Sequence, residues 1–178
     1  MTIAATDLQV RLSTTAGSAG DSLASTPAGS LGKYLSTTVL ADANLHNLFD
    51  AVTGAEAAVG SVEYRCLFVL NSHATETLRE TSVWIESQTP GGADVMIGLD
   101  PAGVTPKAQA GAQAATIASE TAAPTGVTFS RPQTAGGALL VGDVAALSGF
   151  AVWVQRTVQS DPRALATDGV KLHAQGYS

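Results

Sequence analysis

The sequence predicts an all-β protein, an antiparallel β-sandwich of immunoglobulin-like or jelly-roll-like type with an extended N-terminal arm. Short runs of alternating apolar residues recur, Gly and Pro interrupt them often, and no strong helical pattern follows Ser61. A chain of 178 residues is long enough for one well-buried domain plus an arm. We therefore assign the arm to residues 1–45 and the sandwich to residues 46–178.

The N-terminal region differs from the rest of the chain in its residue pattern. Leu8, Val10 and Leu12 alternate with polar residues, which is the pattern of a half-buried strand. Residues 13–32 are small and polar, and they predict a loop or an extended arm. We count Leu8, Val10 and Leu12 as candidate interface residues.

Residues 42–54 allow two interpretations. Leu45, Leu48, Phe49 and Val52 have helical spacing, and Asp42 is a candidate cap for a short helix. The alternative is a strand over residues 48–52 that ends in a turn at Thr53–Gly54.

The run VEYRCLFVLN, residues 62–71, is the clearest strand. Four residues point one way, and we expect them to fill the sandwich as core: Tyr64, Cys66, Phe68 and Leu70. Glu63, Arg65, Leu67 and Val69 point the other way. Because both faces are largely apolar in the middle, the pattern predicts a central strand that is covered on two sides.

Further strands are predicted over residues 82–86, 94–99, 126–129, 139–141, 149–158 and 170–174. Their core positions include Val83, Ile85, Val152 and Val154. Turn signals lie at residues 71–73, 89–92, 100–101, 135–137, 161–162 and 168–169. Residues 107–123 are rich in Ala but have no wide apolar face, which predicts a long surface loop.

Composition excludes several classes of function. A net charge of -6 and the absence of a basic stripe argue against nucleic-acid binding. No stretch approaches the roughly 18 apolar residues of a membrane span. A single cysteine excludes an internal disulfide framework. Only 13% of the residues are charged, so the surface is largely neutral, which suits permanent assembly.

Candidate chemistry is sparse. We find no nucleophile or phosphate-loop motif and no histidine pair at metal spacing, so we expect no catalytic residue, metal or cofactor. Cys66 is expected to be a small buried hydrophobe. Five turn aspartates could gather around Ca²⁺, but turn formation is the favoured explanation for them: Asp94, Asp100, Asp143, Asp161 and Asp168.

Four residues are candidates for contact with a partner. Glu63 and Arg65 share a strand face, where they would form either a surface ion pair or an intersubunit salt bridge. Trp84 and Trp153 alternate against the aliphatic residues of their strands. They would mark a contact patch if that face meets solvent, and would be core if it is covered.

Three segments carry a resemblance to a known family: LFDAVTGAEAAVGSVEYRCLFVLNSHATETLRETSVWI, then GVTFSRP, then GFAVWVQRTV. Together they resemble a group of small structural proteins of tailed bacteriophages, over Leu48 to about Leu172. The first 45 residues and the Ala/Gln-rich loop after Pro106 fall outside the pattern. The resemblance implies virion structure, and it transfers no catalytic residue.

We therefore expect a virion structural protein that is assembled in the host cytoplasm. The favoured role is a capsid decoration or cement protein that binds the major capsid protein on the outer head surface, as a trimer or another cyclic homo-oligomer. A neck or tail-tip component is the alternative within the virion. A carbohydrate-binding module with exposed tryptophans is the alternative from another class. An enzyme is the least supported interpretation.

Overall fold

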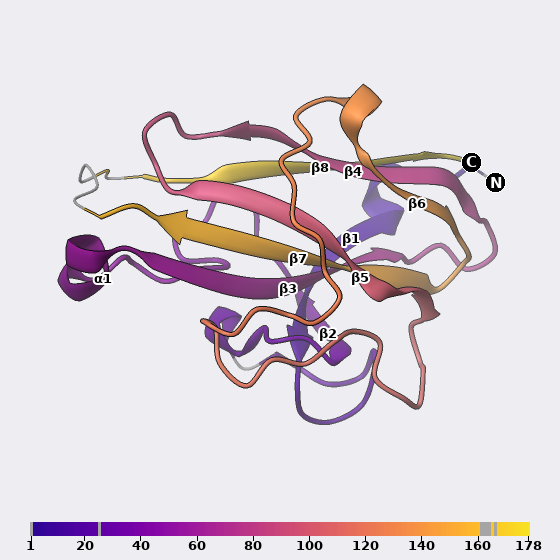
Figure 1. Cartoon of the computed structure of the whole chain (residues 1–178). Helices are drawn as coiled ribbons and strands as arrows, with labels where there is room; N and C mark the ends of the chain where they lie inside the picture. Colours follow the sequence, from indigo (N-terminus) through magenta and orange to yellow (C-terminus); the bar gives the residue numbers. More distant parts are fainter. Residues whose placement is uncertain (1, 25, 161–164, 166) are drawn as a thin grey trace.

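The computed structural model describes residues 2–24, 26–160, 165 and 167–178, and it contains two antiparallel sheets packed face to face (Figure 1). The five-stranded sheet has the order β2-β1-β3-β7-β5: β1 (Leu8–Thr14), β2 (Tyr34–Val39), β3 (Ser61–Asn71), β5 (Asp94–Pro106) and β7 (Ser148–Val158). The three-stranded sheet has the order β6-β4-β8: β4 (Leu78–Gln88), β6 (Leu139–Val144) and β8 (Val170–Tyr177). The predicted all-β sandwich is confirmed.

β3 and β7 are the centre of the fold. They pair without interruption from Ser61 opposite Val158 to Asn71 opposite Ser148. On the face toward the three-stranded sheet, Leu67 and Val69 pack in one apolar cluster with the inner residues of the other strands, which include Val83, Ile85, Val152 and Val154. The prediction that residues 62–71 form a central strand covered on both sides is confirmed.

The opposite face of the five-stranded sheet has an apolar cluster of its own. Cys66, Phe68 and Leu70 are buried there and Tyr64 is partly buried, but they pack under irregular chain, including Leu31 and Ile117. The expectation that these four side chains fill the space between the sheets is therefore wrong. Alternation shows which residues share a face, but it does not show which face meets the second sheet.

The N-terminal arm is also a wrong prediction. β1 lies between β2 and β3, and residues 8–12 pair directly with residues 67–71. Leu12 is buried, and Leu8 and Val10 pack against the cluster between the sheets. All three residues therefore contribute to packing within the chain, Leu12 as a buried side chain and Leu8 and Val10 as half-buried ones. The small polar residues that suggested an arm form a loop that bends back along β2.

Neither interpretation of residues 42–52 holds, because they form turns and irregular chain. The helix begins later, as α1 (Gly54–Val59). Thr53 caps it: its hydroxyl accepts from the Glu56 N–H at 3.2 Å, and the Glu56 carboxylate accepts from the Thr53 N–H at 2.6 Å. Within the described residues, the other helical segments are 3₁₀ turns: η1 (Ala5–Asp7), η2 (Pro27–Gly29) and η3 (Ala135–Gly137).

Several segments outside the central strands differ from what the sequence predicts. Residues 107–123 do lie outside the strands, but part of this segment covers the five-stranded sheet and buries Gln113, Ala114 and Ile117 (Figure 1, orange). The strand predicted at residues 126–129 is absent, and Ser130 makes only an isolated bridge to Ile97. The turn predicted at residues 100–101 is instead a bulge inside β5, and the turn predicted at 161–162 lies outside the described residues.

Candidate functional site

Trp153 is fully buried on the loop-covered face of the five-stranded sheet. Its indole Nε1 donates to Oδ2 of Asp100 at 2.8 Å. The same oxygen accepts from the Ala115 N–H at 2.8 Å, and Oδ1 accepts from the Ala102 N–H at 2.9 Å. Trp153 is therefore not an interface residue. Its hydrogen bond to Asp100, which also accepts from Ala115, links the loop over residues 107–123 to the five-stranded sheet.

Trp84 lies on the outer face of the three-stranded sheet but is only 8% exposed. It stacks on His173 of β8, with the ring centroids 4.2 Å apart and the planes at 17°. Of the two interpretations of Trp84, contact patch or covered side chain, the covered one holds.

Glu63 and Arg65 form neither of the arrangements predicted for them. Both are buried within the chain, and they belong to separate ion pairs. Glu63 accepts from Arg156 of β7, at 2.9 Å from Nε and through a second, shorter contact from Nη2. Arg65 pairs with Glu120 of the covering loop. An intersubunit role is thus excluded, because Glu63 and Arg65 contact no solvent.

Burial raises the pKa of the Glu63 carboxyl, and the positive charge of Arg156 offsets part of that rise. Phe49 lies against both guanidinium groups, with its ring centroid 5.3 Å from Cζ of Arg65 and 4.7 Å from Cζ of Arg156. The backbone carbonyl of Asp50 accepts from Nη1 of Arg156 at 2.7 Å. We call Phe49, Asp50, Glu63, Arg65, Glu120 and Arg156 the charge cluster.

Most of the charge cluster comes from three short sequence blocks that lie far apart along the chain. Phe49 and Asp50 belong to LFD, Glu63 and Arg65 to EYRC, and Arg156 to RTV. The sequence did not show that these blocks meet, because their contacts join residues as far apart as 50 and 156. Their role in the structure is to hold the segment before α1 against the five-stranded sheet.

The four turn aspartates within the described residues each have partners in the chain, Asp100 as given above. Asp94 pairs with Arg131 at 2.9 Å, Asp143 accepts from the Glu80 N–H at 3.0 Å, and Asp168 accepts from the Ala93 N–H at 2.8 Å. Asp161 lies outside the described residues. Across the part of the chain that the structure describes, no three His, Cys, Asp or Glu residues group closely enough to hold a metal ion.

Cys66 offers no reactive thiolate. Its side chain is completely buried, and this burial raises the pKa of the thiol well above its ordinary value. It packs as a small apolar residue, as the sequence predicts.

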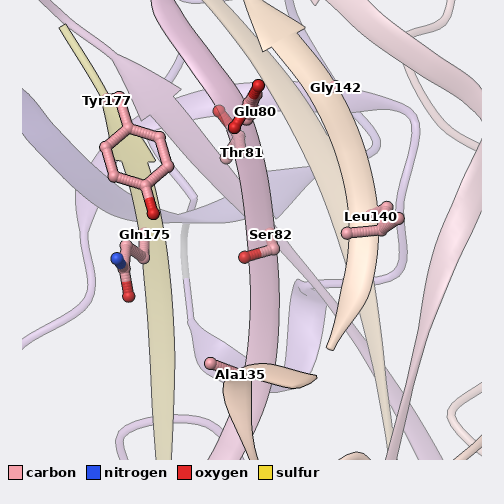
Figure 2. A pocket seen from close by; sticks show the side chains of 8 residues that line it. All are labelled: Glu80, Thr81, Ser82, Ala135, Leu140, Gly142, Gln175 and Tyr177. Atoms are coloured by element: carbon pink, nitrogen blue, oxygen red, sulfur yellow. The ribbon is translucent and has the colours of Figure 1, made fainter. Parts of the chain in front are cut away.

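An open hollow of about 440 Å³ lies on the outer face of the three-stranded sheet. Figure 2 shows its lining: Glu80, Thr81 and Ser82 on β4, Leu140 and Gly142 on β6, Gln175 and Tyr177 on β8, and Ala135 in η3. Leu140 is 79% exposed and Tyr177 is 59% exposed. The lining holds one carboxylate and no histidine, lysine or cysteine.

Comparison with known proteins adds no identity: no family model, no curated protein and no solved structure matches this chain. Among the helices of the described residues, none combines the length and the apolar character that crossing a membrane requires.

Proposed function

We propose that this chain is a structural protein of a tailed-bacteriophage virion, specifically a decoration or cement protein that binds the outer surface of the head. The charge cluster carries the proposal. Segments that resemble phage structural proteins, although far apart in sequence, contact one another at Phe49, Glu63 and Arg156. The residues that carry the resemblance therefore contact one another in the folded chain. This supports the proposal that the similarity extends to the whole fold.

The surface supports a role in assembly. The chain is poor in charge, and Leu140 and Tyr177 are exposed in an open hollow whose lining includes one charged side chain, Glu80. Each copy would add a modest interface to the major capsid protein, and the symmetry of the shell would multiply that contribution over many equivalent sites. β1 is part of the sheet, so this docking does not use an N-terminal arm.

A neck or tail-tip component is the second candidate, since the same neutral surface suits either place. The carbohydrate-binding alternative depended on exposed tryptophans, and both are buried. The carbohydrate-binding alternative therefore loses the observation on which it depended.

Copy number tests the proposal. Particles purified from the phage that encodes this chain should contain hundreds of copies, measured by quantitative mass spectrometry against the major capsid protein. A count of about a dozen or fewer would favour the neck or tail, where symmetry provides few sites. Absence from purified particles would overturn the virion assignment altogether.

The docking face can be tested in the same particles. Leu140→Asp should reduce incorporation, because it places a charge on the face proposed to be buried. Val59→Asp is the matched control, since Val59 is 80% exposed on α1, far from β6 in Figure 1. Equal loss with both variants would argue against this face.

A further inference from the structure

The two sheets differ in how their edges are protected. Along β2, the outermost strand on one side of the five-stranded sheet, the Gly20 N–H donates to Leu35 O at 2.7 Å and the Thr37 N–H donates to Ser22 O at 2.8 Å. Along β5, Ile97 and Ser130 exchange two backbone hydrogen bonds of 2.9 Å. Irregular chain thus covers part of each edge of this sheet, which limits pairing with other molecules.

The outer strands of the three-stranded sheet lack hydrogen-bonded cover of this kind over the described part of the chain. Among the described residues, no backbone hydrogen bond joins β6 or β8 to any segment other than β4. Both outer strands therefore present unpaired backbone groups, and such groups form a template for strand addition.

β8 is the better template of the two. β6 has only six residues, contains Gly142 at a φ of +90°, and pairs with β4 in a shifting register. β8 has eight residues. Its ladder with β4 shifts twice, but both times the extra residue lies in β4, between Arg79 and Ser82 and between Ile85 and Ser87. β8 itself is an unbroken strand.

Two surface hollows lie beside the C-terminal half of β8. The hollow of Figure 2 reaches its outer side at Gln175 and Tyr177. A second hollow of about 210 Å³ lies beside Gln175 and is also lined by Ile3, Leu8, Ala174 and Gly176, among others. An added strand would fill space next to existing apolar groups, which favours its binding.

We propose that β8 pairs antiparallel with β8 of a second copy of this chain, across a two-fold axis at Ala174, to form one continuous six-stranded sheet. This pairing is isologous, so it closes with two copies. It does not depend on the function proposed above.

The side chains of β8 complement themselves in this register. Lys171, His173, Gln175 and Tyr177 share the outer face, as alternation and the pairing with β4 require. With Ala174 on the axis, Lys171 lies opposite Tyr177 of the second copy, and His173 lies opposite Gln175. No like charges meet. A register centred on His173 would instead place two histidines against each other.

On the inner face the same register sets Leu172 opposite Gly176, whose side-chain position is occupied by Leu78 of the same chain. Lys171 and His173 are already paired with Glu86 of their own chain, at 3.1 and 3.3 Å. The new seam therefore brings no uncompensated cluster of charge to the edge.

Sedimentation equilibrium of the purified chain over a wide concentration range tests the proposal. The wild type should show a reversible monomer–dimer equilibrium. Tyr177→Lys places an ammonium opposite Lys171 twice per dimer and should raise the dimer dissociation constant about tenfold. Adding Lys171→Gln to Tyr177→Lys removes the like-charge contact across the seam and places no second carboxylate beside Glu86, so it should recover most of the affinity.

Leu140→Lys is the matched control, because it introduces the same charge on the outer face but at the β6 edge, and it should leave the equilibrium unchanged. Circular dichroism spectra should show that all the variants are folded. The proposal is overturned by a wild type that stays monomeric, by a trimer, by equal weakening from Leu140→Lys, or by a double variant that fails to recover.

Discussion

Removing the Asp100 carboxylate should release the loop that covers the five-stranded sheet. Asp100 is nearly buried and accepts from three donors: Trp153 Nε1, the Ala115 N–H and the Ala102 N–H. Asp100→Ala would leave the fully buried indole donor unpaired, which costs about 1–3 kcal/mol. Loss of two further hydrogen bonds at less buried positions adds about 0.5–1.5 kcal/mol each.

We expect a total loss of about 3 kcal/mol in the free energy of unfolding, measured by urea titration. For a chain of this size, that corresponds to a fall of about 6–12 °C in Tm. Asp100→Asn should lose less, about 1 kcal/mol, because its amide oxygen can still accept from Trp153 and Ala115 while its NH₂ faces the more exposed Ala102 N–H.

Limited proteolysis adds a local readout, since cleavage within residues 107–123 should accelerate in Asp100→Ala. Asp143→Ala is the matched control. Its carboxylate is exposed, accepts one backbone N–H and lies 3.7 Å from Arg79, so the loss should stay below about 1 kcal/mol. Wild-type stability of Asp100→Ala, or equal losses for Ala and Asn, would refute the role assigned to this carboxylate.

Two further variants test the buried face of the five-stranded sheet and the charge cluster. Phe68→Ala should lower the free energy of unfolding by about 3–5 kcal/mol through the cavity it leaves, and wild-type-like thermal melting would show that this face is not core. The raised pKa of Glu63 means that the folded state binds a proton more readily than the unfolded state, so its contribution to stability should fall as pH rises above the ordinary carboxyl range. The stability difference between wild type and Glu63→Gln, measured by urea titration at several pH values, should therefore decrease through that range; a difference independent of pH would contradict the shift.

The sequence alone was sufficient for the fold class and for the strands with clear alternation. The run at residues 62–71 has apolar residues on both faces, and it is the central strand, β3. Residues 149–158 lie within β7 for the same reason. The helix was misplaced because Leu45 and Val52, which suggested it, are exposed. The capping pair of Thr53 and Glu56 is the sequence pattern that indicates where α1 begins.

The candidate contact residues were the least predictable part. Glu63, Arg65, Trp84 and Trp153 were singled out because polar or aromatic side chains interrupt apolar strands, yet each has a partner within the chain. Those partners lie on other strands and loops, such as Asp100, 53 residues from Trp153. No local pattern contains that information.

What the sequence determined by itself is local: side chains alternate along extended chain, so apolar period-two runs specify strands and the residues that share each face. What the tertiary structure decided is which face meets which neighbour. Irregular loops covered the side expected to meet the second sheet, and a supposed arm became an inner strand. The reason is that burial depends on the whole chain's packing, and segments without any regular pattern exclude water as effectively as strands do.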